Sequence, residues 1–585
     1  MKPAATADNR ELDLVVLSLL AVLVGCVTGV GAMALRYLIS LVHNVLFLGE
    51  FSFFYDANLP TPPSPLGPLV ILVPVIGGAV VVFLVSRFAP EARGHGVPEV
   101  MDAIYYKGGR IRPAVVVVKS VASALSIGSG ASVGREGPII QIGSAIGSVL
   151  GQVFRLRTWQ IITLVAAGAG AGIAATFNTP LGAVMFAVEL MLPGLSARTF
   201  LPVVLATGTA TYVGRLAFGI EPAFLVVSQV RPDVLTPVAL DTLPISGLLG
   251  VLCGVGAMVF VRTLHRVEDL FDAMPFNAYV RNAIGMLAIG VLMYAMLLGT
   301  GSYQTAGVGY ATIQSILSGE YALPWLLLLL FAAKLFATTV SLGAGASGGI
   351  FSPSLFLGAT LGGAFGAILD AIWPGLALSP IAFALIGMGA MVGGATGAAM
   401  TAILMIFEMT GDYGITVSVI VAVACAIGTR RALLYENIYT MKLARRGHHI
   451  PKDRHMHMFQ IRHASDVMRP VVGAVERGAL RPAATGLRSD DDAAAYSVVV
   501  ENGRIDGVVP VDPDDPHCAA GPVIGRFGVA REGDFLQGLM ERMARRGHKA
   551  TLVVRGGSGV PRPDNVVGVV GREGIADAII DDYGR

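Results

Sequence analysis

The sequence predicts an all-α polytopic membrane domain followed by a small α/β domain. The chain of 585 residues is 54% hydrophobic and 14% charged, and its mean hydropathy is +0.68, which excludes an ordinary soluble protein of this size. Apolar runs recur between residues 14 and 426, many close to the ~20 residues that a spanning helix needs. Several are shorter or broken by glycine and proline, and broken spans commonly line a functional cavity.

Four segments follow one another along the chain. Residues 1–13 form a short N-terminal segment without the basic region and cleavage site of a signal peptide, so the run from Leu14 is expected to remain as a helix. The membrane domain is expected over 14–443, a polar linker over 444–458 and a soluble domain over 459–585.

Basic residues flank the apolar runs unevenly. By the positive-inside rule, the segments that carry them and both termini are expected to face the cytoplasm of a plasma or inner membrane. The loop 51–65 has no Lys or Arg and several aromatic residues, as expected of an outer-face loop. The flanking basic residues are Arg87, Arg93, Lys107, Arg110, Arg112, Arg430, Arg431, Lys442, Arg445 and Arg446.

The C-terminal segment alternates strand and helix signals. Two β runs surround Asn502-Gly503, a strong hairpin signal. A helix is predicted over 533–547, strands in T-L-V-V and V-V-G-V-V, and a final helix over 575–580.

The membrane domain contains an internal repeat, roughly 90–225 against 305–443. At an offset of 215, nine identities fall in the 24 positions from Gly128 to Gly151, most of them at glycine or proline. A second block agrees at an offset of 219, where Glu189 meets Glu408. Repeats in broken spans are typical of transporters built from two inverted halves, with the site at the midplane.

Each repeat places a glycine-rich turn before a proline, Pro138 or Pro353, and then a helix with glycine at every fourth position. Proline suits the first helical turn, and the amides at a helix N-terminus attract anions. Dehydrating a small anion is costly, so several converging amides are needed. The sequence therefore predicts two helix N-termini that face one anion.

The two repeats differ where Glu136 falls on Phe351. A carboxylate aimed at an anion site competes with the anion when ionised and releases the site when protonated, so Glu136 is a candidate gate. The alternative is a structural carboxylate paired with Arg135, and the same G-R-E-G letters at residues 571–574 fit an ordinary turn.

These segments resemble the CLC family of chloride channels and proton-coupled chloride antiporters. The resemblance rests on G-H-G-V-P from Gly94, G-R-E-G-P from Gly134, G-I-F-S-P from Gly349 and Y-E-N-I from Tyr435, in the family's order. It implies a homodimer with a separate anion pathway in each subunit, gated by Glu136. The anion-binding residues that it implies are His95, Gly134, Arg135, Gly137, Ile350, Phe351 and Tyr435.

Two positions depart from the family pattern. His95 stands where the family usually has serine, so chloride selectivity is open. The alternative interpretation of His95 is a loop residue facing water, and that of Tyr435 is an interfacial anchor. In F-A-V-E-L-M, Glu189 matches the first of two consecutive glutamates, a candidate for the proton pathway, and Leu190 replaces the second. Leucine carries no proton, which favours channel-like conduction; the alternative is proton-coupled chloride exchange.

Other functions are less well supported. An intramembrane enzyme using Glu136 and His95 lacks a nucleophile–base pair or metal frame, and a membrane-bound sensor would leave the polar spans unexplained. The tail resembles a pair of CBS regulatory domains, which leaves adenine-nucleotide binding open, and nothing predicts nucleic-acid binding. The histidines of the basic linker lack a carboxylate or cysteine frame, so no metal site is predicted from His448, His449, His455, His457 and His463.

Overall fold

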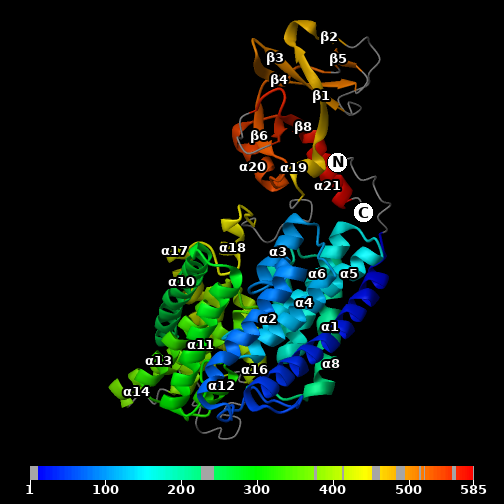
Figure 1. The fold of residues 1–585 in the computed structure, drawn as a ribbon. Helices are drawn as coiled ribbons and strands as arrows, with labels where there is room; N and C mark the ends of the chain where they lie inside the picture. The colour runs from blue at the N-terminus through cyan, green and yellow to red at the C-terminus, as the bar shows by residue number, and fades with distance from the viewer. Residues whose placement is uncertain are drawn as a thin grey trace. The chain divides into compact units, whose positions relative to one another are not determined.

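The computed structural model describes residues 11–224, 243–374, 379–411, 414–450, 462–482, 495–512, 515–519, 521–555 and 561–583. The chain divides into two compact units, and the division falls after Ile450. The first unit is helical and the second contains the sheet (Figure 1).

The membrane unit is a bundle of long and short helices. Within the described ranges, nine helices are long and apolar enough to cross a membrane, while others, such as α3 and α12, are much shorter. Its helices are α1 (Leu14–His43), α2 (Val73–Phe88), α3 (Val97–Tyr106), α4 (Ala114–Gly128), α5 (Glu136–Val153), α6 (Thr158–Phe177), α7 (Pro180–Phe186), α8 (Ala197–Phe218), α10 (Leu243–Ala273), α11 (Ala278–Thr300), α12 (Tyr310–Leu317), α13 (Pro324–Gly343), α14 (Phe351–Ile372), α15 (Pro380–Thr396), α16 (Ala399–Thr410), α17 (Thr416–Leu433) and α18 (Thr440–Arg445).

The duplication predicted from the sequence is present in the backbone. Gly130 and Gly345, related by the offset of 215, have φ angles of +100° and +99°. Gly94 and Gly309, related by the same offset, have φ angles of +76° and +81° and precede α3 and α12. Figure 1 shows α3 and α12 at opposite ends of the bundle, so the two repeats run in opposite senses.

The helices that begin at the glycine-rich turns pack very closely against their neighbours. A Cβ on Gly143 in α5 would collide with the backbone of Gly168 in α6, and the reverse also holds. The second repeat does the same with Gly358 in α14 and Gly387 in α15. These helix pairs therefore depend on the absence of side chains at the crossing points.

We expect Gly358→Ala to lower the free energy of unfolding by ~1–3 kcal/mol, because overpacking forces the backbone apart. The new Cβ would lie 2.6 Å from the Cα of Met388, which cannot move without shifting α15. Gly363→Ala in the same helix is the matched control, since the three atoms nearest to its Cβ all belong to side chains, the closest being Leu327 at 3.3 Å. Thermal unfolding in detergent measures both, and equal midpoints would contradict the close-packing explanation.

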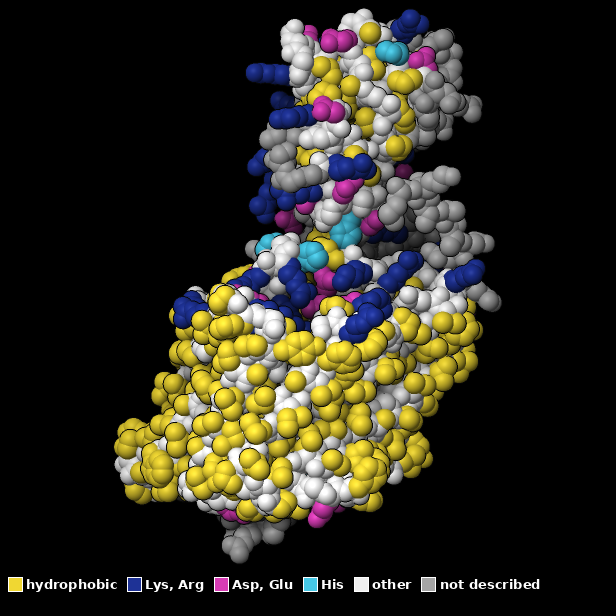
Figure 2. All heavy atoms as spheres, viewed as in Figure 1, with side chains coloured by type: hydrophobic (Ala, Val, Ile, Leu, Met, Phe, Trp, Pro, Cys, Tyr) yellow, Lys and Arg dark blue, Asp and Glu magenta, His cyan; other side chains and the backbone are white. Residues whose placement is uncertain are grey.

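Charged side chains gather at one rim of the membrane unit. Figure 2 shows Lys and Arg side chains along this rim and apolar side chains over the rest of the visible surface. Many of the basic residues are paired: Arg112 binds Glu91, Lys107 binds Asp102 and Arg446 binds Glu99. We call this band of basic residues and their partners the basic rim.

The second unit is built around a mixed sheet flanked by helices. The strands are β1 (Arg469–Glu476), β2 (Arg481–Pro482), β3 (Ala495–Glu501), β4 (Arg504–Asp512), β5 (Asp515–Ala519), β6 (Phe527–Arg531), β7 (Ala550–Val554) and β8 (Val566–Gly571). In the part described they form one sheet in the order β2-β5-β4-β3-β1-β8-β7-β6. Three helices accompany it: α19 (Ala464–Val467), α20 (Leu536–Arg546) and α21 (Arg572–Tyr583).

The sequence predictions for this unit are largely confirmed. Asn502 and Gly503 both have positive φ angles, +52° and +74°, and join the antiparallel strands β3 and β4 as a tight hairpin. The predicted helix over 533–547 is α20, which ends before Gly547 in the left-handed conformation. The final helix begins at Arg572, three residues earlier than predicted, directly after β8. His455 and His457 lie outside the described residues.

Candidate functional site

Three glycine-rich loops of the membrane unit meet at one place. The Gly94 amide donates to the Ala346 carbonyl, and the Gly348 amide donates to the Gly94 carbonyl, both at 3.3 Å. Gly134 and Gly349 exchange two backbone hydrogen bonds, of 2.7 and 2.6 Å. Segments more than 200 residues apart in the sequence therefore form one site, as the repeat predicts.

Gly137 shows how close this approach is. A Cβ at this position would collide with the His95 carbonyl oxygen and lie 2.8 Å from the Cα of Gly349. Only glycine allows all three loops to contact one another here. The pattern of glycines before Pro138 is thus required by packing as well as by the amides that it exposes.

Two helices begin at this junction. Arg135 is the N-cap of α5, and Ile350 is the N-cap of α14. Among the described residues, no hydrogen-bond acceptor engages the amides of Gly137, Ile350 or Phe351. Ile350 and Phe351 are 1% and 3% exposed. Free amides at buried helix N-termini are suited to bind an anion.

The structure places Gly134 differently from its predicted role as an anion ligand. Its amide is taken up by Gly349, so it holds the two repeats together instead of facing an anion. The guanidinium of the neighbouring Arg135 lies 5.2 Å from the ring centre of Tyr310. Farther along the G-R-E-G segment, Glu136 accepts from the Ser352 amide of α14, and Gly137 packs against Gly349.

The Glu136 side chain is buried among hydrogen-bond donors. It is 1% exposed. One carboxylate oxygen accepts from the Tyr310 hydroxyl and from the Ser352 hydroxyl, the latter at 2.5 Å, and the other accepts from the Ser352 amide at 3.4 Å. The carboxylate therefore binds the N-terminus of α14, the same kind of donor that an anion would use.

Tyr310 and Ser352 are site residues that the sequence reasoning missed. Ser352 lies inside the G-I-F-S-P segment, one position after the predicted ligands. Tyr310 follows Gly309. These two residues stand 215 positions after Gly94 and His95, so extending the repeat would have predicted Tyr310 as the counterpart of His95. The two residues of this pair differ in type, so residue identity alone does not reveal Tyr310.

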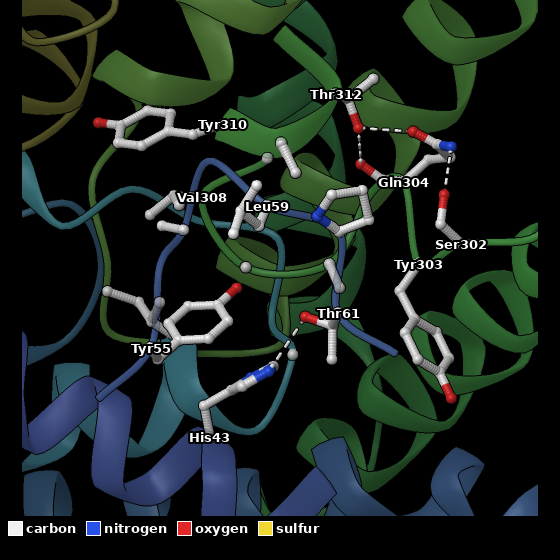
Figure 3. Close-up of a pocket in the computed structure, with 18 of the residues that line it drawn as sticks. His43, Tyr55, Leu59, Thr61, Ser302, Tyr303, Gln304, Val308, Tyr310 and Thr312 are labelled. Atoms are coloured by element: carbon white, nitrogen blue, oxygen red, sulfur yellow. Dashed lines mark hydrogen bonds between the residues drawn. The ribbon is translucent and has the colours of Figure 1, made fainter. Parts of the chain in front are cut away.

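A cavity opens near Tyr310, on the side away from the basic rim. Figure 3 shows part of its lining: His43, Tyr55 and Thr61 from the first third of the chain face Tyr303 and Gln304 from the second repeat. An adjoining cavity of about 250 Å³ also includes Arg135 and Tyr310 in its lining. Both cavities thus reach Tyr310, whose hydroxyl binds Glu136.

His95 lies at the junction on the side of α3. Its side chain is fully buried, and neither ring nitrogen has a hydrogen-bond partner among the residues that the structure describes. Its ring centre is 6.1 Å from that of Tyr439. The interpretation of His95 as a loop residue facing water is therefore wrong.

Tyr435 is not part of the junction. It is 57% exposed, whereas Tyr439, four residues later, is 1% exposed and lies beside His95. The side chain of Arg430 fixes this segment by donating to the carbonyls of Leu434 and Tyr435. The tyrosine of this site is Tyr439, and the assignment to Tyr435 is corrected.

Glu189 caps a helix. Its carboxylate accepts from the amides of Met400 and Thr401 and from the Thr401 hydroxyl, at 2.7–2.9 Å, at the N-terminus of α16. Its repeat mate Glu408 accepts from the amides of Leu181 and Gly182 at the N-terminus of α7, at 3.0 and 2.8 Å. The two repeats thus cap each other symmetrically, which gives both glutamates a structural role.

We expect Glu189→Ala to lower the free energy of unfolding by ~1 kcal/mol, the usual cost of a lost helix cap. Any proton movement that accompanies anion transport should be unchanged, because the carboxylate is occupied by α16. Glu408→Ala is the matched control with the same expected loss of stability. Loss of proton movement in Glu189→Ala alone would return this residue to the proton pathway.

The site combines three features: broken helices in inverted repeats, helix N-termini that converge with free amides, and a buried carboxylate. Together they define an anion transport protein of the membrane. Residues 77–431 match the family described as voltage gated chloride channel. The chain belongs to this family, commonly called CLC.

Known relatives agree with this assignment. The H(+)/Cl(-) exchange transporter ClcA of Vibrio parahaemolyticus is 35% identical over 388 residues, which are 65% of this chain and 80% of that protein. A solved structure of a slow cyanobacterial Cl-/H+ antiporter is 28% identical, with a TM-score of 0.64 over 74% of this chain and 97% of that one. A eukaryotic CLC transporter, 20% identical, shares the fold with a TM-score of 0.61 over 96% of this chain and 98% of its own. The chain is thus a transporter of anions and not an enzyme.

Proposed function

We propose that this protein exchanges chloride, or a similar small anion, for protons. The observation that carries the proposal is the position of Glu136, whose buried carboxylate is bound by the N-terminus of α14. An anion can take this place only when the carboxylate leaves, and protonation removes the charge that holds it there. Proton binding and anion binding are then coupled at one group.

The comparisons favour exchange over the channel-like conduction expected from Leu190. The ClcA relative named above is an exchange transporter, and a solved structure of similar fold is an antiporter. The side chain of Leu190 is 2% exposed in the membrane unit, and because it has no titratable group it cannot carry a proton. The proposal therefore requires that protons pass by another residue.

Within the pathway, each group has a proposed role. Glu136 is the gate, and the amides of Gly137, Ile350 and Phe351 bind the anion. Arg135 attracts anions from the cavity that adjoins Tyr310. Tyr439 and His95 line the inner side. The family resemblance further supports a homodimer in the lipid bilayer with one pathway in each subunit.

The orientation and the second unit are also proposed. The basic rim faces the cytoplasm by the positive-inside rule, with the second unit on the same side of the plasma or inner membrane. The element order β6, α20, β7, β8, α21 supports a CBS-like regulatory domain over 459–585 after a linker at 444–458. A direct binding measurement tests whether this domain binds an adenine nucleotide.

Purified protein in liposomes under a chloride gradient tests the function, with a chloride electrode and a pH electrode in the outer solution. We expect chloride to drive protons against an imposed pH gradient. Chloride flux that leaves the proton gradient unaffected would overturn exchange and restore the channel. Absence of both fluxes with chloride, but flux with fluoride or nitrate, would retain exchange and change the anion.

A further inference from the structure

His95 and Tyr310 occupy the same place in the two inverted repeats. Each follows a glycine in the left-handed conformation, Gly94 or Gly309, and each stands at the offset of 215 from the other. The turn before each is held by a fully buried lysine. Lys119 donates to the carbonyls of Ala92 and Gly94 at 2.9 and 2.7 Å, and Lys334 donates to those of Thr305 and Gly307 at 3.2 and 3.1 Å.

The equivalence gives each residue a defined relation to the gate. Tyr310 donates its hydroxyl proton to the Glu136 carboxylate from the outer side. His95 approaches from the opposite side, with its carbonyl oxygen against Gly137, the residue next to Glu136. The repeat thus places a titratable imidazole where the other half has the hydroxyl that binds the gate.

The imidazole of His95 lacks any partner in the described structure. Both ring nitrogens are buried without a hydrogen bond, although an unsatisfied buried polar group costs ~1–3 kcal/mol. Such a group in a native site calls for a partner that is present only during function. A transported ion, or the Glu136 carboxylate in another position, would supply that partner.

Polar groups continue from His95 to the basic rim. The Nζ atom of Lys442 lies 3.2 Å from the place that a Cβ on Gly94 would take. Lys442 forms an ion pair with Glu99 at 3.5 Å, and Glu99 forms a second ion pair with Arg446 at 2.8 Å. The side chain of Arg446 is 42% exposed. The corresponding path by Glu189 and Leu190 offers only a helix cap and an apolar side chain.

The charges around His95 link its protonation to the anion. Burial acts most strongly against a protonated His95, and the basic side chains of Lys442, His265, Lys119 and Arg446 add repulsion. They repel an imidazolium when the pathway is empty, whereas an anion beside the ring offsets that repulsion. Proton binding at His95 and anion binding next to it therefore favour each other.

We propose that His95 carries protons between the basic-rim side and Glu136. This inference rests on the proposed exchange function. A ring nitrogen takes a proton from water on the basic-rim side; its N–H bond then breaks as the proton forms an O–H bond with the Glu136 carboxylate. The imidazole returns to its neutral form, and no other reactant is consumed.

The test compares His95→Gln with the unchanged protein in the same liposome assay. Glutamine keeps an N–H donor for an anion but does not titrate. We expect chloride flux within about threefold of the original and protons moved per chloride reduced at least about tenfold. His43→Gln is the matched control, because it removes another buried histidine of the membrane unit, which binds Thr61 and lies away from His95, and its coupling should be unchanged.

The outcomes separate the two proposals. If the unchanged protein moves no coupled protons, the exchange function fails, and the role of His95 fails with it. If the unchanged protein couples and His95→Gln couples equally well, only the role of His95 is overturned. If His95→Gln does not fold, His95→Ser is measured by the same criterion. If a folded His95 variant loses chloride flux, His95 is assigned to anion binding, and proton transfer is overturned.

Discussion

Replacing Glu136 by glutamine is expected to abolish proton transport while chloride continues to cross the membrane. Glutamine has the shape of glutamate but neither binds nor releases a proton near neutral pH, and it carries no charge to compete with an anion. Proton flux should fall at least about tenfold, with chloride flux retained. Paired chloride and pH electrodes on liposomes measure both quantities.

Glu408→Gln is the control for this prediction, since it changes a second glutamate of the membrane unit that binds the N-terminus of α7 and lies away from the gate. Its proton transport should match that of the unchanged protein. If Glu136→Gln folds, as judged by gel filtration, and transports neither ion, Glu136 would be needed to form the anion site. Unchanged proton transport would remove Glu136 from the mechanism.

Replacing Lys119 by methionine is expected to produce the largest loss of stability. Methionine fills a similar volume but removes one hydrogen bond from each of the carbonyls of Ala92 and Gly94, which then keep only the Ser347 hydroxyl and the Gly348 amide as donors. The expected loss is ~2–5 kcal/mol, because two buried hydrogen bonds from a charged group are lost. Chloride flux should fall as well, since Gly94 of the same turn bonds Ala346 and Gly348 at the junction. Thermal unfolding and liposome flux measure the two effects.

Lys334→Met should behave alike, because Lys334 holds the equivalent turn of the other repeat. Arg93→Met is the control: its side chain is 49% exposed and that of its partner Asp272 is 58% exposed, so their ion pair is worth ~0–1 kcal/mol. An unfolding midpoint of Lys119→Met equal to that of Arg93→Met would show that the two lysine hydrogen bonds contribute little to stability.

The duplicated frame of the membrane domain could be predicted from the sequence, because glycine and proline carry backbone geometry that tolerates few substitutes. The identities from Gly128 onward correspond to equal φ angles at Gly130 and Gly345. The hairpin at Asn502 was predictable for the same reason. In both cases the residue type alone restricts the conformation of the chain.

The partners of individual side chains could not be predicted in this way. Lys119 binds backbone carbonyls, which every residue has, so no sequence pattern marks its partners. Y-E-N-I-Y offers two tyrosines four residues apart, and only the bend of the chain before α18 decides that Tyr439 is buried and Tyr435 exposed. Glu189 has a side chain that could carry a proton, but its carboxylate accepts hydrogen bonds from the N-terminus of α16 in the other repeat.

The paired hydrogen bonds between Gly134 and Gly349 join the two repeats directly at the pathway. Each repeat supplies one strand of this small bridge and cannot close it alone. A half-length ancestor would therefore have needed a second copy of itself to form the same junction, with two identical residues at the positions now held by Glu136 and Phe351. Fusion of the two copies into one chain allowed those positions to diverge, and a gate on one side of the anion is what that freedom produced.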